Sequence, residues 1–136
     1  MNAKSEYMLL FAGTEWYNEV SPAEAKKISE QAKAWFEGLL QRGCVKGGHG
    51  LARTGTHLTA KTGRVISDGP YPESKEVVGG YMIVEAESLE EAVAMAKGNP
   101  TIAYGTSIDV RPAFQGEENC PLYKRARMAE LEPAAA

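Results

Sequence analysis

Apolar and polar residues alternate along this chain in blocks that predict strands and amphipathic helices in turn. The compact run Tyr7-Met8-Leu9-Leu10-Phe11 predicts a buried first strand. Ser21-Pro22-Ala23-Glu24 then supplies an N-cap, a proline at the first helical position and a capping-box glutamate, so a helix is expected from here to Arg42. The apolar positions of this helix recur at three- and four-residue steps: Ala25, Ile28, Ala32, Trp35 and Leu39, with Phe36 and Leu40 widening the stripe.

The second half of the chain repeats this alternation. Residues 56–59 and 64–67 flank Lys61-Thr62-Gly63 and predict a hairpin whose loop has a left-handed residue at Gly63. Gly80 to Ala86 alternates as a strand, and the glycine pair Gly79-Gly80 at its start predicts a bulge or a close approach of another chain, where a side chain would clash. A second capping box, from Ser88 to Glu91, begins a helix that Gly98 and Pro100 stop, and residues 106–111 form the last strand.

Strand, helix, two or three strands, helix, strand is the order of a ferredoxin-like α+β fold, in which an antiparallel sheet carries two helices on one face. Nothing else in a single domain of this kind covers the opposite face of the sheet. We therefore expect a homodimer that buries this face.

Composition excludes several classes of partner. The 136 residues carry a formal charge of −3, and this balance does not predict the basic patch of a nucleic-acid-binding protein. No apolar run approaches the roughly 20 residues of a membrane span, and no signal peptide is recognisable, so a soluble, cytoplasmic protein without membrane contact is expected. Cys44 and Cys120 are far apart in the sequence and are expected to be free thiols.

Candidate chemistry centres on the turn Asp68-Gly69-Pro70. Asp68 either caps backbone N–H groups of the turn or acts as a general base or ligand anchor. His49, between two glycines, is the second candidate for proton transfer, whereas His57 is expected to be an ordinary residue of a strand. The two histidines and Asp68 lack metal-ligand spacing, so no metal is expected.

Aromatic residues are candidates for the wall of a small-molecule cavity, although core or interface packing explains them equally well. They are Tyr71, Tyr81, Trp16 and Tyr17. The segment Gly47-Gly48-His49-Gly50 matches neither a phosphate loop nor a dinucleotide fingerprint, so no nucleotide and no other cofactor is predicted.

Residues 68–76, the Gly79-Gly80-Tyr81 strand start and the segment Gly47 to Leu51 together resemble the YCII-related superfamily in its DGPF branch. The resemblance runs from roughly Tyr7 to Pro112. It implies a dimeric α+β barrel in which two sheets pack face to face, with Glu73 and Lys75 at the pocket entrance. We divide the chain into a YCII-related domain of residues 3–114 and a tail of residues 115–136, in which a short helix is expected from Pro121 to Glu130.

Three functions remain open at this point. The first is a small-molecule-binding or regulatory accessory homodimer, with a link to stress signalling because DGPF-type proteins resemble products encoded beside extracytoplasmic-function sigma factors. The second is a cofactor-free acid–base enzyme similar to lyases or dehydrochlorinases. Those relatives place a histidine on the first helix opposite the aspartate, and the first helix here contains none. The third is a purely structural dimer.

Overall fold

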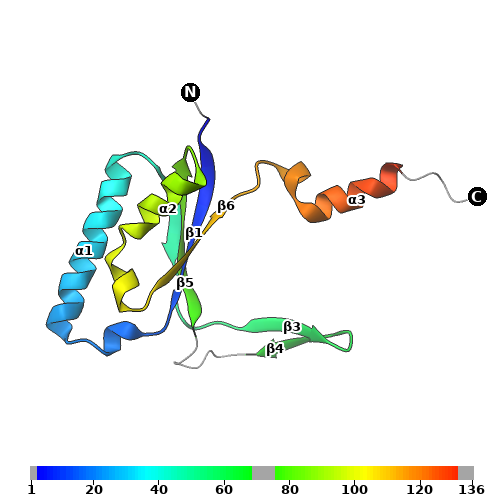
Figure 1. Ribbon diagram of the computed structural model, residues 1–136. Helices are drawn as coiled ribbons and strands as arrows, with labels where there is room; N and C mark the ends of the chain where they lie inside the picture. Colours follow the sequence, from blue (N-terminus) through cyan, green and yellow to red (C-terminus); the bar gives the residue numbers. More distant parts are fainter. Residues whose placement is uncertain (1–2, 69–75, 132–136) are drawn as a thin grey trace, which may run out of the picture.

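The computed structural model describes residues 3–68 and 76–131 (Figure 1). A four-stranded sheet carries two helices, and a separate hairpin and a C-terminal helix extend from it. The elements of the sheet and its helices are β1 (Ser5–Gly13), α1 (Pro22–Gln41), β2 (Val45–Gly50), β5 (Val77–Ala86), α2 (Leu89–Lys97) and β6 (Ser107–Pro112). Short 3-10 turns at Trp16–Asn18 and Pro100–Tyr104 connect them.

The strands lie in the order β2-β5-β1-β6, and every neighbouring pair is antiparallel. With α1 and α2 on one face of this sheet, the arrangement is the predicted ferredoxin-like fold (Figure 1). Because the two central strands are β1 and β5, the side chains that alternate along them decide which face of the sheet is buried.

The core lies between the helices and the helix-facing side of β1 and β5. Leu9 and Val84 have no accessible surface, and Met82 and Ala86 alternate with partly exposed residues as the pattern predicted. Removing such apolar side chains from water stabilises the fold by about 1.5–3 kcal/mol each. The helices contribute Ile28, Leu39, Ala92, Met95 and Ala96.

Both helix starts have the predicted caps. The Ser21 hydroxyl accepts a hydrogen bond from the Glu24 N–H at 3.1 Å, and the Ser88 hydroxyl accepts one from the Glu91 N–H at 3.1 Å. Each cap satisfies an N–H group that has no partner within its helix, which is worth about 1 kcal/mol. The capping residues therefore fix where α1 and α2 begin.

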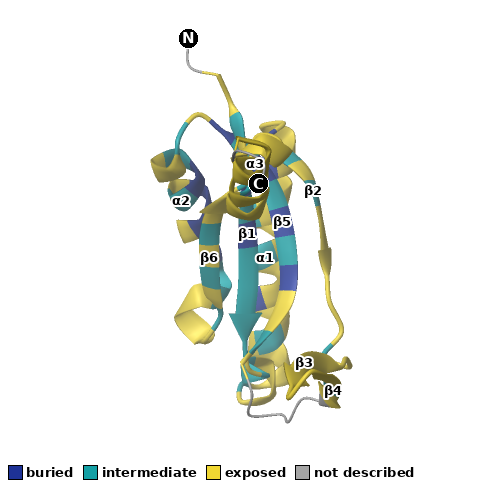
Figure 2. Cartoon of the chain, turned by 90° about the vertical axis from the view of Figure 1, so that its right-hand side faces the viewer, coloured by how far each residue is buried: buried dark blue, intermediate teal, exposed yellow. Residues whose placement is uncertain are grey.

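No helix within residues 3–68 and 76–131 packs on the second face of the sheet (Figures 1 and 2). Met8 and Leu10 of β1 lie opposite Ile83 and Tyr81 of β5 on this face, and all four are only partly buried. We call this surface the open face. Among the described residues, no helix is long and apolar enough to cross a membrane.

The structure corrects the sequence prediction in the middle of the chain. The strand that pairs with the outer edge of β5 is β2. The sequence did not predict it, because Lys46-Gly47-Gly48-His49-Gly50 has no apolar alternation. The predicted hairpin exists as β3 (His57–Lys61) and β4 (Arg64–Asp68), but it forms a two-stranded sheet of its own. Lys61 pairs with Arg64, so the turn contains only Thr62 and Gly63, both at positive φ, instead of three residues.

The glycine pair at the start of β5 contains the predicted bulge, and the backbone that approaches it closely is β2 of the same chain. Gly79 is the extra residue of a bulge, because Phe11 pairs with Gly80 and Ala12 pairs with Val78. A Cβ added at Gly80 would lie 3.1 Å from the His49 carbonyl oxygen. The neighbouring strand thus approaches β5 too closely for a larger residue at this point.

Beyond β6 the chain continues through a 3-10 turn at Glu117–Asn119 into α3 (Pro121–Leu131). The predicted C-terminal helix is confirmed, one residue longer than expected. It contains no buried residue and points away from the sheet (Figure 1).

Candidate functional site

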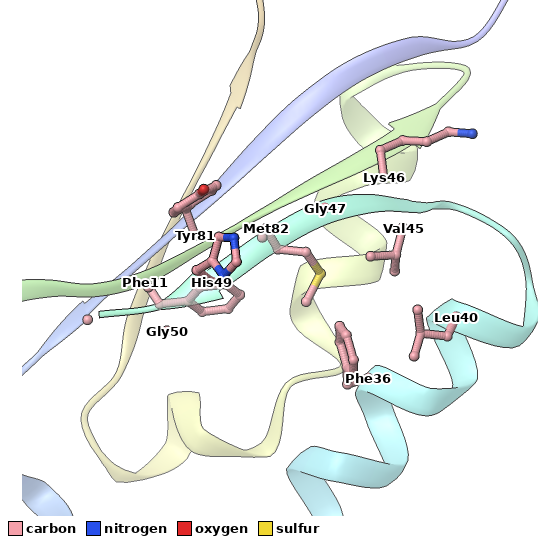
Figure 3. A pocket seen from close by; sticks show the side chains of 13 residues that line it. Phe11, Phe36, Leu40, Val45, Lys46, Gly47, His49, Gly50, Tyr81 and Met82 are labelled. Atoms are coloured by element: carbon pink, nitrogen blue, oxygen red, sulfur yellow. The ribbon is translucent and has the colours of Figure 1, made fainter. Parts of the chain in front are cut away.

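A hollow of about 570 Å³ lies between α1 and the edge of the sheet formed by β2 and β5 (Figure 3). This volume is in the range of small-molecule sites, about 300–1,000 Å³. Phe36 and Leu40 on its helical side are 37% and 47% exposed, so solvent reaches the hollow. It is lined by Phe11, Phe36, Leu40, Val45, Lys46, Gly47, Gly48, His49, Gly50, Gly79, Gly80, Tyr81 and Met82.

Glycines create this hollow. On the helix-facing side of the sheet, Gly50 lies opposite Gly80, and Gly48 lies opposite Met82. At these positions a strand normally contributes side chains that fill the space beneath a helix. Because three of the four residues lack side chains, Phe36 and Leu40 of α1 have no partners across the gap, and an apolar space remains.

The glycines have two different roles. Gly48 has φ +149°, and an added Cβ would contact the Tyr81 carbonyl oxygen and lie 2.9 Å from Met82 Cα. The backbone at position 48 therefore excludes any residue with a side chain. At Gly47, Gly50 and Gly79 an added Cβ would meet nothing within 4 Å. The backbone does not require glycine at these three positions, and Gly50, on the helix-facing side of the sheet, keeps the hollow open.

The apolar lining comes from four elements that the fold brings together. Phe36 and Leu40 are one turn apart on α1, and Phe11, Val45 and Met82 come from β1, β2 and β5. Figure 3 shows these side chains around a common space. On the far side of Phe11, the Trp35 ring makes an edge contact with it, with centroids 6.3 Å apart.

Trp35 is itself held in place, because its indole N–H donates a hydrogen bond to the Met95 carbonyl at 2.8 Å. This hydrogen bond joins α1 to α2 behind the hollow. One wall of the site is thus fixed by packing between the two helices.

Polar side chains of the same two strands lie on the open face, on the other side of the sheet from the hollow. His49 and Tyr81 are partners in the β2–β5 register, and their rings make an edge contact with centroids 6.0 Å apart. On the same face, the Lys46 ammonium lies 3.5 Å from a Glu85 carboxylate oxygen. Both partners of this ion pair are partly exposed, so it contributes at most about 1 kcal/mol.

A second hollow of about 280 Å³ adjoins the first, and Phe11 and Gly79 line both. Trp16 and Tyr17, which the sequence suggested as cavity residues, line this second space together with Arg53. Arg53 is held by Glu15 at 3.1 Å and donates a hydrogen bond to the Gly13 carbonyl at 3.3 Å. These contacts make Arg53 a structural residue of the loop after β2.

The sequence-predicted site residues separate into two groups. His49 and Tyr81 meet on the open face, on the other side of the sheet from the hollow. The backbone of Asp68 pairs with His57 at the end of the β3–β4 hairpin, which places it on a different sheet from His49. The Asp68 side chain lies outside the described residues, as do Tyr71, Glu73 and Lys75.

Sequence reasoning missed the apolar lining on α1. Phe36 and Leu40 were assigned to a widened core stripe, because the helix alone does not tell whether side chains stand opposite them. The signal that could have found the site is the coincidence of two glycine-rich segments, at 47–50 and at 79–80, with apolar residues in excess of what the core stripe needs.

Metal binding has no support in the described parts of the chain. Within residues 3–68 and 76–131, no group of three or more His, Cys, Asp or Glu side chains is arranged to hold a metal ion. The side chains that face the hollow are instead suited to an apolar organic ligand.

Comparison with known proteins identifies the domain. The model of the YCII-related domain matches residues 9–113, well over half of the chain. No curated protein matches the chain. The matched segment runs from the middle of β1 to the residue after β6 and so contains the second half of β1, the other three strands of the sheet, both of its helices and the hollow. The chain belongs to the YCII-related family.

Proposed function

We propose that this protein is a small-molecule-binding homodimer that acts as a regulatory accessory protein linked to stress signalling. The observation that carries the binding role is the apolar hollow between α1 and the glycine-rich strand β2. Side chains of an enclosed core normally fill such space, and here it is kept open in part by Gly50, which the backbone does not need. The signalling link rests on the resemblance to DGPF-type proteins.

The lining favours a flat aromatic ligand, such as a phenol or an aromatic carboxylic acid. Phe11 and Phe36 offer ring surfaces, and aromatic groups gain about 0.5–1.5 kcal/mol from such pairs beyond area burial. The polar end of such a ligand would stay in contact with water at the exposed side of the hollow, beside Phe36 and Leu40.

The homodimer is supported by the open face. Met8, Leu10, Tyr81 and Ile83 form a continuous apolar stripe across the two central strands, and nothing in residues 3–68 and 76–131 buries it. Water contact with such a stripe is unfavourable, and a second copy offers an identical stripe.

Binding at the hollow can be tested by a thermal-shift screen of phenols and aromatic carboxylic acids, followed by titration of the compounds that raise the melting temperature. Gly50→Val places a side chain in the hollow at a position with no contact within 4 Å, so the fold should persist. We expect this variant to lose at least about 10-fold in affinity, because even one misplaced group in a packed site costs about 1–3 kcal/mol.

Leu89→Ala is the matched control, because Leu89 is 43% exposed, like Leu40, but lies on α2 and lines none of the hollows described here. It should bind as the wild type does. Equal affinities of wild type and Gly50→Val for every compound would place the ligand elsewhere and refute the proposal.

A further inference from the structure

The segment from Phe114 to Leu131, which we call the arm, lies beyond the residues that match the family model. Its helix α3 has no buried residue, and Leu122 and Leu131 are 76% and 83% exposed. Helices shorter than about 12–15 residues are marginal in water without packing. The 11 residues of α3 therefore need a surface that the described part of their own chain does not supply.

The β3–β4 hairpin also needs a surface on which to pack. Leu58 and Val65 are 63% and 75% exposed, and a two-stranded hairpin alone is marginally stable at best. Figure 1 shows α3 and the hairpin at opposite ends of the sheet, both extending on the side away from α1 and α2. A protein packed on the open face would lie between α3 and the hairpin.

The accessible surface has the size that such an association requires. The chain exposes 10047 Å². A folded monomer of 14.7 kDa is expected to expose about 6,900 Å². The excess is about 3,000 Å² per chain and so about 6,000 Å² for two copies, which is enough for the roughly 2,000–5,000 Å² that a permanent homodimer buries over both partners together.

We propose that the arm of each copy packs on a second copy of this chain, so that two arms clasp a pair of face-to-face sheets. The partner is a second copy because every copy carries the open face, the hairpin and the arm together, and a twofold association buries each of them twice. The inference rests on the homodimer part of the proposed function and is independent of the ligand.

Hydrogen exchange of the full chain, measured across the dimer dissociation range, tests this directly. The amides of residues 121–131 should exchange at least about 10-fold more slowly at concentrations where sedimentation finds dimers than where it finds monomers. Arm amides that exchange at one rate at all concentrations would overturn the clasp. So would arm amides that are already protected in the monomer, or protected only when anionic phospholipid vesicles are added.

A pair of variants measures the contribution of the arm. Leu122→Ser with Leu131→Ser should raise the dimer dissociation constant at least about 10-fold. Lys124→Ser with Glu130→Ser changes the same helix without altering net charge and should stay within about 3-fold. An unchanged dissociation constant for the leucine variant would overturn the clasp and leave the dimer intact. A monomer at micromolar concentration would overturn both, while binding at the hollow would still be tested by Gly50→Val.

Discussion

Gly48→Ala should destabilise this protein strongly although it adds a single methyl group. Gly48 combines φ +149°, which L side chains rarely adopt, with a backbone neighbour that cannot move aside. The new Cβ would lie 2.9 Å from Met82 Cα and against the Tyr81 carbonyl, and both atoms belong to the central strand β5. The clash of the new Cβ with β5 can therefore be relieved only if β2 separates from β5.

Two costs add in this substitution. Holding a non-glycine residue in such a backbone conformation costs about 1–3 kcal/mol, and forcing extra atoms into a packed site costs a further 1–3 kcal/mol or so. We expect the free energy of unfolding to fall by about 2–6 kcal/mol in total. For a chain of this length about 4 °C of melting temperature corresponds to 1 kcal/mol, so the midpoint should fall by about 8–24 °C.

Gly47→Ala is the control, because its Cβ would meet nothing within 4 Å and its φ is not in the left-handed region. It should stay within about 1 kcal/mol of the wild type. Thermal or urea unfolding followed by circular dichroism measures both variants. If Gly48→Ala melted within 2 °C or so of Gly47→Ala, the argument that β2 is pinned to β5 at this residue would be wrong.

Further variants address the rest of the fold and site. Gly80→Val should lower stability by about 1–3 kcal/mol in urea unfolding, since its Cβ would lie 3.1 Å from the His49 carbonyl; a neutral result would contradict the close approach. Trp35→Phe removes the donor to Met95 and should cost about 1–2 kcal/mol by the same assay. Asp68→Asn should retain stability within about 1 kcal/mol but lose binding or turnover of whatever compound the screen finds; equal binding would leave Asp68 a turn residue.

Local sequence signals predicted the helices and the central strands well because their causes are local. Ser21 and Ser88 cap helices through atoms three residues away, and the alternation along β5 needs only its own side chains. β2 escaped prediction for the opposite reason. A strand of lysine, glycines and histidine has no pattern of its own, and it is a strand because the edge of β5 offers it hydrogen-bonding partners.

The β3–β4 hairpin also has one property that is set locally and one that depends on the rest of the chain. Residues 57–68 pair as the turn chemistry at Thr62 and Gly63 requires, and that much was predictable. Whether this hairpin joins the main sheet depends on which segment pairs with the free edge of β5. In this structure β2 occupies that edge. Membership of a sheet is therefore a property of the competition between segments, which local propensity does not contain.

The candidate site was hardly predictable because it consists largely of missing side chains. A search for chemical groups finds His49 and Tyr81, two residues 32 positions apart that the β2–β5 register makes neighbours on the open face and not in the hollow. Such a search does not find Phe36 and Leu40, whose exposure depends on glycines on a different element. The opposed behaviour of Gly48 and Gly50 separates the two reasons for a glycine here. Gly48 keeps the strand in place, whereas Gly50 keeps the hollow empty, so a substitution at Gly48 should alter stability and one at Gly50 should alter binding.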